Sequence, residues 1–164
     1  MRPPTRPDKP GKPGDAGVAL PGGTLEDARM NFGAVMGIFF GAGVGALARW
    51  GLGLALNPLF PTLPLGTLAA NAIGGLLMGV LLAVFNQFDA LPPVLRLALL
   101  TGFLGGLTTF STFSAEIVTL LMRGQLVWAG VGIGLHVGTS LLATWGGYAL
   151  THALLLAYVH GARP

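Results

Sequence analysis

Cysteine is absent from this chain of 164 residues, and charged side chains make up only 9% of it. The absence of cysteine excludes disulfides, thiolate metal sites and cysteine nucleophiles. A water-soluble domain normally carries about 25% charged residues, whereas 52% of this chain is hydrophobic. This composition predicts a membrane protein.

Most of the few charges lie in residues 1–29. This segment is rich in proline and glycine, mixes both signs of charge, and lacks the apolar core and the cleavage site of a signal peptide. We interpret it as a disordered tail; a chain start upstream of the real one, with Met30 opening the first apolar run, is the other interpretation. Because five of the nine basic residues lie in this tail, the basic composition does not indicate a nucleic-acid partner.

The remaining charges separate long apolar stretches, and a helix needs roughly 20 apolar residues to cross a bilayer. Three prolines, at 58, 61 and 64, belong in a connection rather than in a helix. The sequence therefore predicts an all-α membrane protein, with a transmembrane domain at 30–160 and no soluble domain within it. Its four expected helices span about residues 32–53, 65–87, 93–122 and 126–156.

Arginines near the helix ends bear on orientation. Arg96 and Arg163 fall on one side of the membrane, and Arg49 and Arg123 near the other. Basic residues in short flanking loops set the direction of insertion. Outside residues 1–29 this balance is even, which predicts that single molecules insert in both directions unless Arg29 and the tail fix the orientation.

Glycines recur every four residues along three of the expected helices, at 33, 37, 41 and 45, at 75 and 79, and at 130, 134 and 138. Small residues at this spacing let helix backbones approach closely in lipid, so we assign them to packing and not to chemistry. On the fourth helix a polar row of His136, Ser140 and Thr144 is offset from the glycines by about half a turn. We expect its glycine face to pack and the opposite face to be polar.

Polar side chains inside the crossings are the informative minority, because burying one without a partner costs several kcal/mol in hydrocarbon. Asn71 is the most conspicuous polar residue in the second expected helix. It makes either an interhelical hydrogen bond for stability or a ligand contact. His136 is either satisfied within the bundle or lines a pore.

The stretch GGLTTFSTF, from Gly105 to Phe113, interrupts the third apolar region with two glycines and four hydroxyls. Such a sequence is poor helix, and a break at membrane depth is tolerated only where it is buried in protein or lines a polar cavity. The carbonyls of a broken helix bind cations and its amide ends attract anions. A phenylalanine ring edge also carries positive partial charge. The segment therefore predicts an ion site.

Three segments, GAGVGALARW (41–50), PLGTLAANAIGGLLMG (64–79) and GFLGGLTTFSTFSAE (102–116), resemble the signature segments of the Fluc fluoride channels, also called the CrcB family. The resemblance runs from about residue 36 to 148. It implies an antiparallel, dual-topology homodimer of four-helix subunits, with two fluoride pores and a structural sodium ion at the dimer interface. It also implies a multi-pass protein of the cell inner membrane that passively exports fluoride from the cytoplasm and is not an enzyme.

The resemblance also implies roles for individual residues. Asn71 matches the asparagine that contacts fluoride, and Phe110 and Phe113 match the phenylalanines whose ring edges line the pore. The other matching positions are the hydroxyl pair Ser111 and Thr112, the sodium-binding carbonyls of Gly105 and Thr108, Arg49 at the end of the first helix, Ser140 on the polar track, and Glu116 near a pore mouth. On the fourth helix Gly132 and His136 stand where tyrosine and serine are common, so the chain departs from the family there.

Two other classes of function fit the sequence less well. A small dual-topology multidrug-type exporter relies on a carboxylate buried within a membrane helix, and helices one, two and four contain no Asp or Glu. An intramembrane serine protease would need an activated serine with a histidine base, and Ser111 with His136 supplies only the residue types. A non-transporting assembly subunit leaves the phenylalanine and hydroxyl cluster unexplained.

Overall fold

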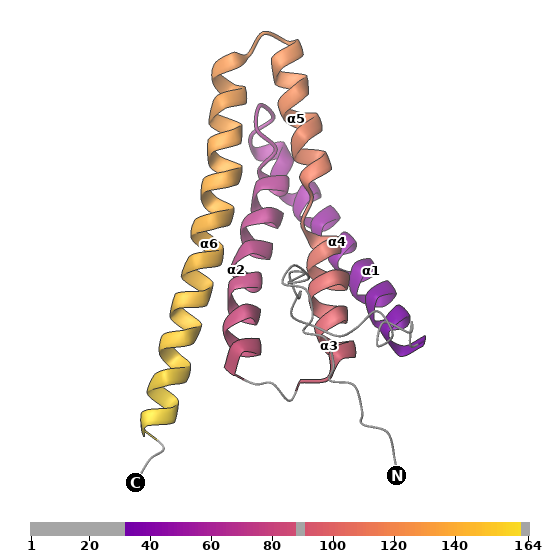
Figure 1. Ribbon diagram of the computed structural model, residues 1–164. Coiled ribbons are helices and arrows are strands. Elements are labelled where there is room, and N and C mark those ends of the chain that lie inside the picture. Colours follow the sequence, from indigo (N-terminus) through magenta and orange to yellow (C-terminus); the bar gives the residue numbers. More distant parts are fainter. Residues whose placement is uncertain (1–31, 88–90, 162–164) are drawn as a thin grey trace, which may run out of the picture.

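The computed structural model describes residues 32–87 and 91–161, and these residues fold entirely as helices and connections (Figure 1). The tail expected at 1–29 lies outside the described residues. The elements are α1 (Phe32–Leu56), η1 (Asn57–Leu59), α2 (Leu65–Gln87), α3 (Pro93–Leu97), η2 (Ala98–Leu104), α4 (Gly105–Leu107), α5 (Phe110–Met122) and α6 (Leu126–Gly161). The start of α1 and the end of α6 lie at the same end of the bundle (Figure 1).

Four helical segments are long and apolar enough to cross a membrane, in agreement with the sequence. The second and third run from Leu65 to Gln87 and from Pro93 to Met122, as predicted. The first and last helices extend beyond their predicted ends, to Leu56 and Gly161. Three of the bundle's prolines lie at or just after the end of α1, in the connection to α2.

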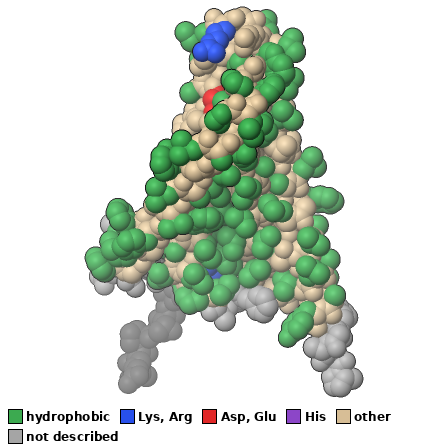
Figure 2. Space-filling model, turned by 180° about the vertical axis from the view of Figure 1, so that it is seen from behind, with side chains coloured by type: hydrophobic (Ala, Val, Ile, Leu, Met, Phe, Trp, Pro, Cys, Tyr) green, Lys and Arg blue, Asp and Glu red, His purple; other side chains and the backbone are tan. Residues whose placement is uncertain are grey.

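Large apolar side chains cover the outside of the bundle, and hydrophobic groups dominate the face shown in Figure 2. Phe39 is 66% exposed, Leu142 70% and Trp145 71%. Water would solvate so many apolar groups poorly, whereas lipid chains are as apolar as these side chains. The exposed surface supports the membrane assignment.

Close helix contacts depend on glycines of α1 and α2, as the sequence predicted. A Cβ added to Gly75 would lie 2.8 Å from the carbonyl oxygen of Ser140 on α6. One added to Gly79 would lie 2.7 Å from the amide nitrogen of Tyr148. On α1, a Cβ at Gly41 would lie 2.9 Å from the Phe103 amide nitrogen of η2. These backbones therefore touch only because the side chains are absent.

The expectation for α6 was wrong in one respect. A Cβ added at Gly130, Gly134 or Gly138 would meet nothing within 4 Å in the described chain. The opposite, polar face of α6 packs against α2, with the backbone of Ser140 close to Gly75. Glycines on both helices permit this contact: Gly75 and Gly79 of α2 face α6, and a Cβ added to Gly147 of α6 would lie 3.2 Å from the carbonyl carbon of Leu76.

The third crossing is not one regular helix. It begins as α3, widens into the π-helical segment η2, and continues as the short α4, which ends at Leu107. Thr108 and Thr109 have extended backbones, with ψ 155° at Thr108 and φ −152° at Thr109. Helix resumes at Phe110 as α5.

Separate apolar clusters fix the two parts of this crossing. Leu104 and Leu107 are buried with Ala70, which attaches η2 and α4 to α2. A second cluster joins α5 to α6 and to the α1–α2 connection; its members are Leu63, Phe113, Ile117, Leu120 and Ala129. Because each part is anchored independently, the extended segment between them is held from both ends.

The turn between α5 and α6 closes with a glycine in the left-handed region. Gly124 has φ +72°, its N–H donates to the Leu121 carbonyl, and the N–H of Gln125 donates to the Leu120 carbonyl. This pair of bonds is the Schellman motif, which satisfies carbonyls at a helix end and favours glycine at the left-handed position. The turn brings α6 back along α5 and α2, and so places its polar row beside Asn71.

Candidate functional site

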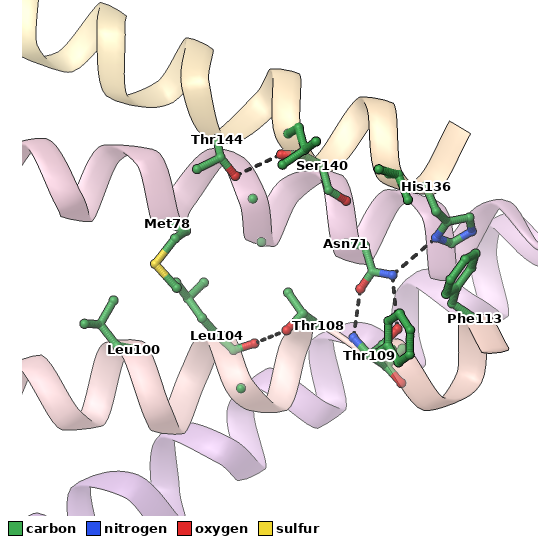
Figure 3. Close-up of a pocket in the computed structure, with 16 residues that line it drawn as sticks. Asn71, Met78, Leu100, Leu104, Thr108, Thr109, Phe113, His136, Ser140 and Thr144 are labelled. Carbon is green, nitrogen blue, oxygen red and sulfur yellow. Dashed lines mark hydrogen bonds between the residues drawn. The ribbon is translucent and has the colours of Figure 1, made fainter. Parts of the chain in front are cut away.

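A cavity of about 480 Å³ lies between α2, α6 and the third crossing (Figure 3). Seven of the eleven candidate site residues line it, namely Asn71, Gly105, Thr108, Phe110, Phe113, His136 and Ser140. They come from three separate crossings of the bundle. The structure therefore brings together residues that lie up to 69 positions apart in the sequence, from Asn71 to Ser140.

Asn71 pairs with the backbone of Thr109 in both directions. Its Oδ1 accepts the Thr109 N–H at 2.8 Å, and its Nδ2 donates to the Thr109 carbonyl at 3.1 Å. The same Nδ2 lies 3.3 Å from Nδ1 of His136 (Figure 3). The side-chain amide of Asn71 thus hydrogen-bonds the backbone N–H and C=O of Thr109, as a neighbouring strand would. The Thr109 N–H has no helical partner, because the segment is extended.

Thr109 also caps α5, a role that sequence reasoning missed. Its Oγ1 accepts the N–H of Thr112 at 3.1 Å and donates to the Thr112 hydroxyl at 3.0 Å. The hydroxyl of Ser111 also lies within hydrogen-bond distance of this oxygen, at 3.2 Å. The signal for this residue was its place at the start of the TFST hydroxyl run, directly before a helix.

The extended segment leaves two carbonyls without their helical donors. In a continuous helix Gly105 would accept from Thr109 N–H, and Thr108 from Thr112 N–H. The first of these amides donates to Asn71 and the second to the Thr109 side chain. Within the described residues no other hydrogen bond reaches either carbonyl. The two oxygens predicted to bind sodium are therefore available, and carbonyl oxygen suits that hard cation.

The Thr108 side chain does not compete for this position. Its Oγ1 donates back to the Leu104 carbonyl at 2.8 Å, one turn earlier. Its methyl group faces α2, where a Cβ added to Gly74 would collide with it. The side chain thus fixes the end of α4, while the backbone carbonyl remains available.

Arg49 sits at the end of α4 and not in the main cavity. Its Nε donates to the Gly106 carbonyl at 3.1 Å, which supplies a cationic donor to a helix C-terminus. It also lines a second cavity of about 270 Å³, together with Thr67, Thr109 and Thr112. Thr109 lines both cavities, so the extended segment that Asn71 binds lies between the two cavities.

Glu116 and Ser111 line neither cavity. Glu116 accepts a 2.6 Å hydrogen bond from the hydroxyl of Thr67, which does line the smaller one. This contact joins α5 to α2 one turn from Asn71. Ser111 is exposed beside Thr109.

The two phenylalanines occupy different environments. Phe113 is 8% exposed, whereas Phe110 is 78% exposed at the margin of the main cavity. Their ring centroids are 5.5 Å apart at 58°. The imidazole of His136 lies over Phe113, with centroids 4.6 Å apart at 34°. The imidazole therefore packs against the Phe113 ring and holds it in place.

Ser140 and Thr144 continue the polar row of α6 along the cavity (Figure 3). The Thr144 hydroxyl donates to the Ser140 carbonyl at 2.8 Å. The hydroxyl of Ser140 itself makes no hydrogen bond within the described residues. The cavity wall thus offers a hydroxyl donor about one turn from His136.

Comparison with known proteins places this arrangement in a family. The family model for "CrcB-like protein, Camphor Resistance (CrcB)" matches residues 36–148. A protein of Aromatoleum aromaticum named "Fluoride-specific ion channel FluC" is 55% identical over 122 residues, which cover 74% of this chain and 93% of that protein. Proteins of the same name from Tolumonas auensis and Chromobacterium violaceum are 55% and 56% identical over 116 residues, covering 71% of this chain and 91% and 92% of theirs. The chain belongs to the CrcB family.

Proposed function

We propose that this protein is a fluoride channel of the bacterial inner membrane, through which fluoride leaves the cytoplasm passively. The observation that carries the proposal is the cavity in which two phenylalanine rings and a few polar side chains meet between apolar helices. The names of relatives more than half identical to this chain support the choice of ion. Export of this kind lowers fluoride toxicity after weak-acid HF enters the cell and dissociates.

Fluoride is small and strongly hydrated, so its path must replace lost water with donors. The path we propose starts at the smaller cavity, with Arg49 and the Thr112 hydroxyl, and passes the segment around Thr109. It continues through the larger cavity past Asn71, His136 and Ser140, between the edges of Phe110 and Phe113. Narrowness and donor strength along this path would exclude chloride.

Passive conduction agrees with the lining of the two cavities. Proton-coupled exporters use a carboxylate buried in a membrane helix. Glu116, the acidic residue of the described helices, lines neither cavity and is bound to Thr67. Neither described lining therefore contains an acidic residue that could serve as such a carboxylate.

The working unit in this proposal is an antiparallel, dual-topology homodimer in which the interrupted third crossings of two subunits meet. The even arginine count supports insertion in both directions. Gly105 is exposed, and a Cβ there would come no closer than 3.9 Å to any neighbour. Phe110 is likewise open on the surface of the single subunit. These features leave the site incomplete until a second copy covers it.

A structural sodium ion is the cofactor that this arrangement fits. The available carbonyls of Gly105 and Thr108 give two oxygens per subunit, and two subunits related by symmetry would give four. Such an ion would neutralise the negative ends of two interrupted helices and hold the subunits together.

Fluoride efflux from liposomes containing the purified protein tests the proposal, with chloride efflux as the control. We expect rapid fluoride release and no chloride release above that of protein-free liposomes. Equal flux of the two anions, or no flux of either, would refute the fluoride-channel function.

A further inference from the structure

His136 is a polar residue of the main cavity, and its hydrogen bond to Asn71 determines which of its ring nitrogens carries the proton. A backbone N–H can only donate, so the atom of Asn71 that faces the Thr109 N–H must be Oδ1. The amide group, Nδ2, therefore points to the other side. There it meets the Thr109 carbonyl at 3.1 Å and His136 Nδ1 at 3.3 Å.

Both hydrogens of the Asn71 amide are thus committed, one to a carbonyl and one to the imidazole. An N–H on Nδ1 of His136 would point at another N–H, so Nδ1 must accept. A neutral imidazole that accepts at one nitrogen carries its proton on the other. Asn71 therefore selects the tautomer of His136 with the proton on Nε2.

The Nε2 atom has no competing partner within the described residues. Although the His136 side chain is only 7% exposed, none of its atoms is among the fully buried polar atoms that lack a partner. Nε2 consequently retains accessible surface, and the larger cavity is the one that His136 lines. Its N–H is a donor without an acceptor of its own.

From these contacts we infer that Asn71 positions His136, and that the Nε2–H of His136 is an N–H donor that meets the anion in this cavity. Asn71 holds the extended backbone of Thr109 and sets the tautomer, while Phe113 supports the imidazole ring from one side. The inference rests on the proposed fluoride conduction, but its first step concerns protonation alone.

Nitrogen-15 NMR of the full-length protein in lipid bilayers, labelled at histidine, tests the tautomer without any flux. The His136 signals are assigned by their loss in His136→Gln. We expect a protonated Nε2 and an unprotonated Nδ1 in the wild type. In Asn71→Asp the carboxylate can only accept, so the proton should move to Nδ1. A wild-type His136 with its proton on Nδ1 would overturn the inference.

Efflux measurements test the second step. His136→Leu should lower fluoride efflux at least about tenfold, since a hydrogen bond to a charged partner is lost. His136→Gln, which keeps an N–H donor, should restore most of it. His152→Leu is the matched control, because His152 is an exposed histidine of the same helix that lines neither cavity. Its flux should equal that of the wild type.

Wild-type efflux from His136→Leu would refute the role of this donor even if the tautomer is as expected. A wild-type protein that passes no fluoride would instead refute the proposed function, and with it the anion contact. The NMR result would then still show whether Asn71 sets the proton of His136. The two failures are therefore distinguishable.

Discussion

Replacing Phe110 with isoleucine separates the proposed anion contact from ordinary packing. Phe110 is 78% exposed, so it contributes little to the core of the subunit. Its one ring contact in the described chain is with Phe113, at 5.5 Å. An aromatic pair is worth about 0.5–1.5 kcal/mol beyond area burial, and an exposed substitution otherwise changes stability by about 0.5 kcal/mol or less. The variant should therefore lose at most roughly 2 kcal/mol.

Fluoride efflux should respond much more strongly than stability. Isoleucine keeps the apolar volume but has no ring edge to face an anion. We expect Phe110→Ile to elute as a dimer and to release fluoride no faster than protein-free liposomes. Phe39→Ile is the matched control, because Phe39 is also an exposed phenylalanine, at 66%, and lines neither cavity. Its efflux should be that of the wild type.

Phe113→Ile provides the contrasting case. This ring is 8% exposed and packs in the cluster that joins α5 to α6, so its replacement changes core packing and should cost up to about 1.5 kcal/mol of stability. Thermal unfolding in detergent measures that difference between the two variants. Wild-type fluoride efflux from a folded Phe110→Ile dimer would show that the exposed ring plays no part in conduction.

Three further predictions concern packing, topology and the cation. Gly74→Ala places a methyl group against the Thr108 side chain, so this variant should be about 1–3 kcal/mol less stable in thermal unfolding. Gly43→Ala is the control, because Gly43 faces open space and its substitution should not destabilise the subunit. Equal stabilities of the two variants would contradict this packing. Because the chain has no cysteine, Gln125→Cys introduces a single thiol for labelling. About half the molecules should react with a label from each side of the membrane. Labelling from one side alone would show a fixed topology. In ion-replacement crystals, central cation density should survive Thr108→Ala better than Gly105→Pro, and crystals of the wild type without such density would exclude the site.

The sequence predicted the helices and the interruption of the third crossing well, because the residues that indicate them lie close together in the chain. Apolar runs between charged residues, together with three prolines, predicted where the chain crosses the membrane. The first of these prolines follows the end of α1 at Leu56. The glycine pair and hydroxyls of 105–112 marked the segment where the third crossing becomes extended. Each of these features depends on residues within a few positions of one another, so periodicity and turn chemistry suffice to predict it.

The sequence could not specify pairings between distant residues. Asn71 and Thr109 are 38 positions apart, and Asn71 and His136 are 65 apart. Nothing local indicates which side chain receives the displaced amide of Thr109. The same limit explains the error on α6, where the spacing gave two opposite faces without deciding which one meets α2. Gly75 and Gly79 of α2 permit that contact, together with Gly147 of α6, which lies outside the predicted glycine row.

The proposed cation and anion sites should be coupled through Asn71, and two substitutions of similar shape separate their effects. Asn71→Leu removes the acceptor of the Thr109 N–H, and a buried amide without a partner costs about 1–3 kcal/mol. That N–H would be satisfied by returning to the Gly105 carbonyl, its helical partner, and one sodium ligand per subunit would be lost. Asn71→Asp keeps the acceptor, so the carbonyl stays available, while the tautomer of His136 is reversed. We expect both variants to lose fluoride efflux, but only Asn71→Leu to lose the rise in melting temperature when sodium replaces a bulky organic cation. Sodium-dependent stabilisation of Asn71→Leu equal to that of the wild type would show that the Thr109 amide does not control the cation site.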